Sequence, residues 1–328
     1  MPPQRCARST ASGLDRISEL PEGVLHRVLS LLPAHDAVRT CVLAQRWRHL
    51  WGWIRVTGVK GWRIADRFVG FVDRLLSLRS GGAPLEAVEF ELDPSDFYFN
   101  FYLLADNWCA SHWIQRALRC NAQVLQLSLD DMAAFRLPGL PLVSEHVTRL
   151  ELDCVTTKNS VLDFSRCPAL VEMKMEYCYI TSDIMSSVSL KKLSMTGCEF
   201  LWQKRTRISL PSLVSLELTR SCGRAPLLEC MPSLATGIVS FEYDCEDYCL
   251  KGECYDGSCD DCRFHEIDDD HTSCVLLNGL SQATHLELSS YPDMVCLQLH
   301  SSLTLVVSFY CILCNKHVHH YNSLNMSI

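Results

Sequence analysis

Cysteine and histidine side chains that could bind a metal ion gather in one short acidic segment. They are Cys245, Cys249, Cys254, Cys259 and Cys262, followed by His265 and His271. Structural zinc takes four thiolate or imidazole ligands, commonly in pairs spaced Cys-x2-Cys, and only Cys259 and Cys262 have that spacing. Residues 242–271 also carry 12 acidic against 2 basic side chains, which is typical of a solvated loop. We therefore expect a loop without metal at 244–273, with zinc on the five cysteines as the alternative.

Other signatures of metal binding or catalysis are weaker or absent from the sequence. Cys311 and Cys314 precede His317, His319 and His320, but the first histidine follows the second cysteine after only two residues. The sequence contains no Gly-rich phosphate loop, no HExxH motif and no GxSxG elbow. We therefore expect a protein that is not an enzyme and needs no cofactor.

Composition and charge describe a globular protein with room for two or three domains. The 328 residues are 48% hydrophobic and 21% charged. Residues 1–13 are polar and lack the apolar run of a secretory signal peptide, so the 19 cysteines are expected to be reduced thiols in the cytoplasm or nucleus. Residues 1–80 carry 13 basic and 6 acidic side chains, but the arginines are dispersed and form no recognition motif. We expect no nucleic-acid binding.

Residues 14–53 have the spacing of a compact helical module. Pro21 suits the first turn of a helix. Apolar residues then recur at helical spacing and give one wide apolar face, formed by Val24, Leu25, Val28, Leu29 and Leu32. After Pro33, Asp36 could cap a second helix, and a third short helix follows with Trp47 and Leu50. The sequence predicts three short helices.

The two ends of this module resemble a known family motif, the F-box in the form common in large plant families. Leu-Pro opens that motif and Arg-Trp-x-x-Leu-Trp closes it, here at Leu20, Pro21, Arg46, Trp47, Leu50 and Trp51. The resemblance implies docking to a SKP-type adaptor and, through it, to a cullin. The residues that it implies for the adaptor face and its supporting core are Leu20, Pro21, Val28, Leu29, Leu32, Val38, Trp47 and Leu50. Ala44 replaces a serine common in the family, which removes an N-cap that contributes about 0.5–2 kcal/mol.

Downstream, an apolar-x-x-apolar-x-apolar pattern recurs seven times. The copies are Val124, Leu127, Leu129; Val147, Leu150, Leu152; Leu170, Met173, Met175; Leu190, Leu193, Met195; Leu213, Leu216, Leu218; Ile238, Phe241, Tyr243; and Ala283, Leu286, Leu288. Their middle positions are 23, 23, 20, 23, 25 and 45 residues apart, and leucine-rich repeats have a period of about 20–29 residues. The alternating pair would point the inner face of a short strand into a solenoid core. The asparagine ladder of the most regular repeats is not evident.

Proline and two helical segments organise the repeat region. Several copies carry the same upstream phrase, in which a proline that cannot continue a preceding helix stands two residues before a leucine, at Pro168, Pro211 and Pro232. The alternative, an ordinary α/β domain, needs helices of about ten or more residues between parallel strands, and these connectors are rich in Ser, Pro and Cys. Residues 64–76 predict an amphipathic spacer helix, 84–92 a first strand and 113–118 a further helix. These segments also resemble plant F-box/leucine-rich-repeat proteins.

The expected architecture is therefore α+β. An N-terminal segment without fixed structure (1–13) precedes a three-helix F-box (14–53), a linker with a spacer helix (54–83), an irregular α/β leucine-rich-repeat solenoid (84–295) and an atypical tail (296–328). Val295 to Asn315 contains no charged residue, but polar residues interrupt it and the apolar run Leu303 to Val307 is short, so a membrane anchor is not expected. Relatives of this type often continue into a domain called FBD, which is not evident here.

The resemblance implies a function as the substrate receptor of an SCF-type ubiquitin ligase. The F-box would dock on the adaptor, while the concave strand face and loop tips of the solenoid would hold an unidentified target protein. The bond-making chemistry would belong to partner subunits. The alternative is an interaction scaffold, or a truncated product, that does not support ubiquitination.

Overall fold

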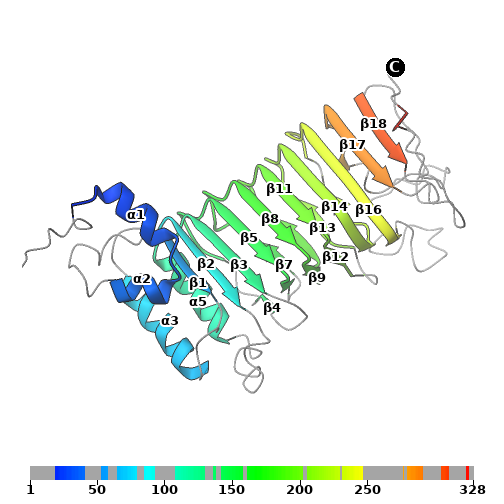
Figure 1. The fold of residues 1–328 in the computed structure, drawn as a ribbon. Coiled ribbons are helices and arrows are strands. Elements are labelled where there is room, and N and C mark those ends of the chain that lie inside the picture. Colours follow the sequence, from blue (N-terminus) through cyan, green and yellow to red (C-terminus); the bar gives the residue numbers. More distant parts are fainter. Residues whose placement is uncertain are drawn as a thin grey trace, which may run out of the picture.

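The computed structural model describes fourteen stretches of the chain. They are residues 19–40, 53–57, 65–79, 85–92, 108–129, 136–137, 142–157, 161–201, 205–229, 231–246, 276, 279–290, 304–309 and 323–324. The described helices are α1 (Glu22–Ser30), α2 (Ala34–Thr40), α3 (Ala65–Arg79) and α5 (Trp108–Arg119). All four lie at the N-terminal end of a long stack of strands (Figure 1). None of these helices is long and apolar enough to cross a membrane.

The longer strands form one continuous parallel sheet. Its central members are β1 (Trp53–Thr57), β2 (Ala87–Leu92), β3 (Val124–Leu129), β5 (Arg149–Asp153), β8 (Glu172–Glu176), β11 (Lys192–Thr196), β14 (Ser215–Arg224), β16 (Thr236–Glu246), β17 (His285–Ser290) and β18 (Thr304–Phe309). They pair in this order, each parallel to the next, and β19 (Ser323–Leu324) adds to β18 in the antiparallel direction. The stack begins at β1, inside the segment that the sequence assigned to the linker.

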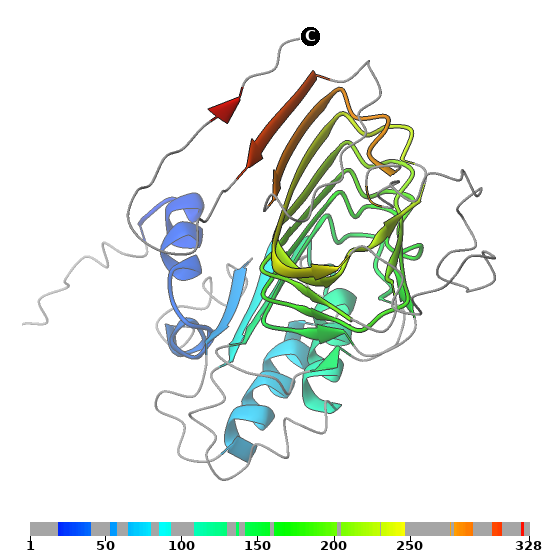
Figure 2. The ribbon, with the colours of Figure 1, turned by 90° about the vertical axis from the view of Figure 1, so that its right-hand side faces the viewer.

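Short strands complete the coils on the sides away from the long strands. One row consists of β4 (Arg136–Leu137), β6 (Thr156–Thr157), β9 (Tyr179–Ile180) and β12 (Glu199–Phe200), and a second sheet of β7 (Val161–Asp163), β10 (Ile184–Ser186), β13 (Arg207–Ser209) and β15 (Leu227–Leu228). Viewed from the end, these strands lie opposite the long sheet (Figure 2). The described connectors between β5 and β16 contain no helix. The expected α/β arrangement is therefore seen where α3 and α5 precede β2 and β3, whereas the described coils from β5 to β16 form a β-solenoid.

The inward rows of the sheet match five of the seven predicted copies and correct two. Leu150 and Leu152, for example, are 2% exposed, and their equivalents in β8, β11, β14 and β17 are buried. In β3 the pairing places Leu125 and Leu127 opposite Leu150 and Leu152, so the predicted Val124, Leu127, Leu129 copy was wrong by two residues. In β16 the same positions are Gly237 and Val239, opposite Leu216 and Leu218, so the predicted Ile238, Phe241, Tyr243 copy was wrong by four.

A tight turn precedes the long strands from β5 to β17 and explains the recurring proline. In three coils the backbone N–H of the first inward residue donates to the carbonyl three residues earlier: Leu170 to Cys167, Leu213 to Leu210 and Leu234 to Met231, each at 3.0 Å. The proline stands inside this turn, where its missing N–H is not needed. In two other coils the hydroxyl of a buried serine replaces the carbonyl as the acceptor. Ser144 accepts from the N–H of Val147 at 3.1 Å, and Ser187 accepts from the N–H of Leu190 at 3.3 Å.

The exits of the long strands repeat as well. The residue after each of β5, β8 and β11 has a left-handed backbone, and so does Arg220 at the irregular point inside β14: the four residues are Cys154, Tyr177, Gly197 and Arg220, with φ between 49° and 63°. Each of the first three donates its N–H to the next coil, as Tyr177 does to the carbonyl of Thr196 at 2.9 Å. The sharp turn sends the chain directly into the short strands, which keeps the coil narrow.

The helices at the N-terminal end belong to the same hydrophobic core as the strands. Leu25 and Leu29 of α1 pack in one continuous cluster with Ile54 of β1 and with the inward rows of the sheet. Trp113 of α5 stacks on Phe90 of β2 with ring centroids 6.0 Å apart and donates to Asp73 of α3 at 3.2 Å. The helical module therefore closes the end of the stack.

The second helix begins differently from the prediction. Asp36 was expected to cap it, but α2 begins at Ala34, and Asp36 is its third residue. The N–H of Asp36 donates to the carbonyl of Pro33 at 2.9 Å, so Pro33 occupies the capping position. Proline lacks only an N–H, and its carbonyl remains free to accept the first helical bonds. The predicted third helix, with Ala44, Trp47 and Leu50, lies outside the described residues.

Candidate docking surfaces

Helix α1 carries two apolar stripes, and only one of them is buried. Leu25 and Leu29 are 1% and 2% exposed and face the core. Val24, Val28 and Leu31, spaced four and three residues apart, are 45%, 49% and 68% exposed. Residues at this spacing lie on one side of a helix. An exposed row of aliphatic side chains next to a well-packed core is typical of a surface that another protein covers.

The position of α1 is fixed from both ends. The carbonyl of Pro21 accepts the N–H groups of Val24 (3.0 Å) and Leu25 (3.2 Å), which starts the helix. At the other end, α2 follows directly, and the ring of its His35 contacts Phe71 of α3 edge to face at 5.8 Å. The exposed stripe is therefore presented by a helix whose inner face is packed, whose first turn is hydrogen-bonded and whose successor contacts α3.

The structure separates the predicted adaptor residues by their exposure. Leu29 is buried, and Leu20, Leu32 and Val38 are half-buried against the core. Pro21 and Val28 are exposed, so they are available to a partner. Trp47 and Leu50 lie outside the described residues. The sequence prediction omitted Val24 and Leu31 from the adaptor face, although their spacing from Val28 could have indicated that the helix has a second stripe.

The outward side chains of the long strands form a second candidate surface, the outer strand face. It carries charged and hydroxyl side chains in three rows, which we call the entry, middle and exit rows in the direction of the strands. The rows between β3 and β14 are Val124, Arg149, Glu172, Lys192, Ser215; Gln126, Glu151, Lys174, Ser194, Glu217; and Ser128, Asp153, Glu176, Thr196, Thr219. No apolar side chain follows Val124 on this part of the face.

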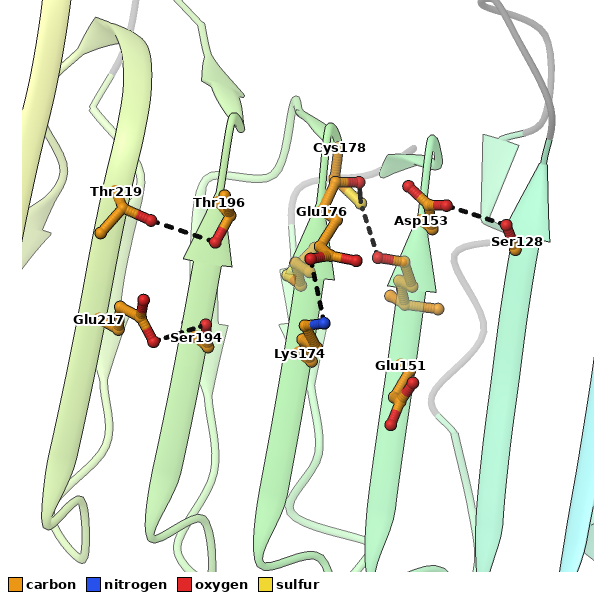
Figure 3. Close-up of polar contacts among 12 residues, drawn as sticks. Ser128, Glu151, Asp153, Lys174, Glu176, Cys178, Ser194, Thr196, Glu217 and Thr219 are labelled. Atoms are coloured by element: carbon orange, nitrogen blue, oxygen red, sulfur yellow. Dashed lines mark hydrogen bonds and ion pairs between the residues drawn. The ribbon is translucent and has the colours of Figure 1, made fainter.

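Neighbouring side chains on the outer strand face hold one another in place (Figure 3). The hydroxyl of Ser128 donates to Asp153 at 2.9 Å, and that of Ser194 to Glu217 at 3.0 Å. The Lys174 ammonium pairs with Glu176 at 3.0 Å, and this hydrogen bond raises the pKa of the lysine above its ordinary value. Most of the charged groups are therefore oriented before any partner binds, which lowers the entropy lost on binding.

The predicted metal ligands are almost entirely outside the described residues. Cys245 lies in β16, whose backbone pairs it with Gly223. Cys249, Cys254, Cys259 and Cys262 fall in a segment that the structure does not describe, so the zinc alternative stays a prediction. Among the described residues, no three His, Cys, Asp or Glu side chains gather as metal ligands would.

Two described cysteines have a structural position that the sequence analysis missed. Cys178 and Cys198 are 1% and 0% exposed, and their thiols donate to carbonyls of the preceding coil, Leu152 at 3.4 Å and Met175 at 3.6 Å. The hydrogen bond between the two thiols and their burial raise the pKa of Cys178, so it stays protonated. Each cysteine follows the last inward residue by three, which is the Asn/Cys position of the leucine-rich-repeat pattern. That spacing was a readable signal.

Comparisons with known proteins identify a domain match that includes α1. Residues 17–57 match the F-box domain, which covers the two stripes of α1. A meiotic F-box protein, MOF, of Oryza sativa subsp. japonica is 30% identical over 228 residues, which cover 62% of this chain and 46% of that protein. A putative F-box/FBD/LRR-repeat protein of Arabidopsis thaliana is 28% identical over 247 residues, 69% of this chain and 53% of its own length.

The chain carries an F-box match and is similar beyond it to plant F-box/leucine-rich-repeat proteins. An F-box/LRR-repeat protein of Arabidopsis thaliana is 23% identical over 235 residues, 64% of this chain and 49% of that relative. The chain thus spans about half the length of the relatives it matches. No solved structure matches it. The F-box match ends at residue 57, the last residue of β1, so the matched segment and the repeat stack share that strand.

Proposed function

We propose that this F-box/leucine-rich-repeat protein is the substrate-recognition subunit of an SCF-type ubiquitin ligase. The exposed stripe Val24, Val28 and Leu31 on α1 carries the proposal, because it lies within the F-box match and is backed by a packed core. In this role the stripe binds a SKP-type adaptor, which links the chain to a cullin. The three-helix form of the F-box, with Trp47 and Leu50 in the third helix, belongs to the same proposal.

The outer strand face holds the target in this proposal. Its oriented charges and hydroxyls suit reversible recognition of a polar segment, since such groups contribute specificity more than raw affinity. The chain itself makes and breaks no bond. It raises the concentration of one target near the ubiquitin donor, which belongs to other subunits. The proposed location is the cytoplasm or nucleus, where the described free thiols stay reduced.

Capture of a purified SKP-type adaptor by the immobilised full-length chain tests this function. Val28→Glu places a charge in the middle of the exposed stripe, where an apolar contact would have to desolvate it, so we expect adaptor binding to fall by about tenfold or more. The matched control is Val214→Glu, because Val214 is 42% exposed but lies on the repeat stack. Circular dichroism checks that both variants keep the secondary structure of the wild type.

The two variants are expected to differ in adaptor binding. Loss with Val28→Glu and retention with Val214→Glu support adaptor docking through α1. Equal capture of Val28→Glu and wild type contradicts the proposed face. No capture by folded wild type contradicts the ligase function and favours an interaction scaffold, the alternative to which the Ala44 departure from the family motif points.

A further inference from the structure

An exposed aromatic ring stands at the exit edge of the outer strand face. Tyr177 follows β8 directly and is 57% exposed. Its ring lies against the backbone of Gly197, the equivalent residue of the next coil, where an added Cβ would come within 2.8 Å of ring carbons Cδ1 and Cε1. The absence of a side chain at Gly197 thus gives the ring its position and leaves more than half of it open to a partner.

Two carboxylates stand in the exit row close to Tyr177 in the strand order, one on the preceding coil and one on the strand that leads into Tyr177. Asp153 and Glu176 are paired neighbours in the exit row, and Glu176 directly precedes Tyr177. Between β3 and β14, the middle and exit rows contain four carboxylates and one basic side chain, Lys174, which is paired with Glu176. The basic Arg149 and Lys192 stand in the entry row, where Arg149 pairs with Glu151 and Glu172. The exposed Arg220, two coils beyond Tyr177, bounds this region.

An arginine side chain fits this combination better than other groups. A guanidinium stacks on an aromatic face and at the same time donates two hydrogen bonds to a carboxylate, whereas an ammonium offers only a point charge. Three strand steps separate β5 from β14, about 14 Å at the usual strand spacing, which about four residues of extended chain can span. A short extended segment could therefore place one arginine on Tyr177 and polar residues over the rows on either side.

We propose that the middle and exit rows of the outer strand face bind an extended, arginine-bearing segment of the target protein, with one guanidinium stacked on Tyr177 and another hydrogen-bonded to Asp153. This inference rests on the proposed use of the outer strand face for target binding. It adds the chemistry of the target, a basic segment in extended conformation, and names the aromatic anchor. Electrostatic complementarity selects such a segment over acidic ones.

Fluorescence anisotropy with three labelled hexapeptides and the full-length chain tests this. The peptides alternate serine with arginine, lysine or glutamate. We expect the arginine peptide to bind more tightly than the lysine peptide and the glutamate peptide not to bind. Tyr177→Ala and Asp153→Asn should each weaken arginine-peptide binding about threefold to tenfold, the range of a partly desolvated cation–π contact or charged hydrogen bond. Tyr177→Phe keeps the ring and should bind as wild type.

Glu172→Gln is the matched control, because it removes one carboxylate from the entry row of the strand that precedes Tyr177. Equal losses with Asp153→Asn and Glu172→Gln would mean diffuse charge attraction and overturn the inference. Full binding by Tyr177→Ala would also overturn it. Attraction of the peptide to the acidic segment 242–271 is the same in every variant, so this segment cannot cause a difference between Tyr177→Ala and wild type. Adaptor capture by the same variants is a separate readout, so failure of the proposed ligase function and failure of this site are distinguishable.

Discussion

The helical module and the repeat stack expose opposite kinds of surface. Helix α1 leaves three aliphatic side chains 45–68% exposed in one row, while the long strands of the stack hide their aliphatic rows almost completely and turn charges and hydroxyls outward. The exposed aliphatic residues of the described stack lie in the turns before these strands, at Val143, Val171, Val188 and Val214. Apolar surfaces favour lasting association, whereas oriented polar surfaces favour selective and reversible contact. Under the proposed function, the apolar surface of the module suits lasting contact with another protein, whereas the polar surface of the stack suits selection of a target.

The strongest way to break this comparison is to change one aliphatic residue on each surface. Leu193 is 1% exposed in the middle of the stack, so Leu193→Ala should lower the free energy of unfolding by about 2–5 kcal/mol, from lost burial and the cavity left behind. Val28→Ala, on the exposed stripe, should change it by less than about 0.5 kcal/mol. Urea denaturation measures both, and similar losses would contradict the distinction between the two surfaces.

A smaller effect is expected at the serine turns of the stack. The hydroxyl of buried Ser187 accepts the N–H of Leu190 at 3.3 Å, in place of the carbonyl that other coils use. Ser187→Ala leaves this N–H without its acceptor and should cost about 1–2 kcal/mol of unfolding free energy. Ser215→Ala, on the outer strand face, is the control and should stay within about 0.5 kcal/mol of wild type. A Ser187→Ala protein as stable as the control would show that the hydroxyl is dispensable.

The smallest effect concerns acid stability of the stack. The backbone N–H of Ser165 donates to Asp163 at 2.8 Å and, with the hydroxyls of Ser165 and Ser186, lowers the pKa of this carboxyl below 3.8. A lowered folded-state pKa means that ionised Asp163 stabilises the fold above about pH 4, and that this contribution is lost as the pH falls through the folded pKa. The thermal midpoint of Asp163→Asn should therefore fall less steeply below pH 4 than that of wild type. Above pH 4, the two proteins should show the same dependence of the midpoint on pH. An unchanged acid profile would contradict this assignment.

The sequence predicted the stack because its inward rows are apolar in nearly every coil. It failed in β3, where Ala122, Leu125 and Leu127 compete with Val124, Leu127 and Leu129 for the same pattern, and only pairing with Arg149–Asp153 decides between them. It failed in β16 because Gly237 occupies an inward position without an apolar side chain. Strand β1 was missed because its five residues become a strand only against β2, which follows 30 residues later.

The candidate surfaces were predictable to different degrees. Helical spacing identified the apolar residues of α1, but the division into Leu25 and Leu29 inside and Val24, Val28 and Leu31 outside depends on where β1 packs. The buried positions of Cys178 and Cys198 could have been predicted, because each cysteine follows the last inward residue of its strand by three. The platform at Tyr177 was not readable from the sequence, because it depends on a left-handed backbone and on Gly197 in the neighbouring coil.

One continuous core joins α1 to the last coils, so the number of coils sets the distance between the two ends of the molecule. Leu25 and Leu29 belong to the same hydrophobic cluster as Leu288 in β17, and every long strand from β1 to β18 follows its neighbour in parallel register. Insertion or deletion of one coil would shift everything beyond it by one strand spacing, about 4.8 Å, and would leave the docking helix unchanged. Gain or loss of coils during evolution could thus set the reach between two binding surfaces in fixed steps, without redesign of either end.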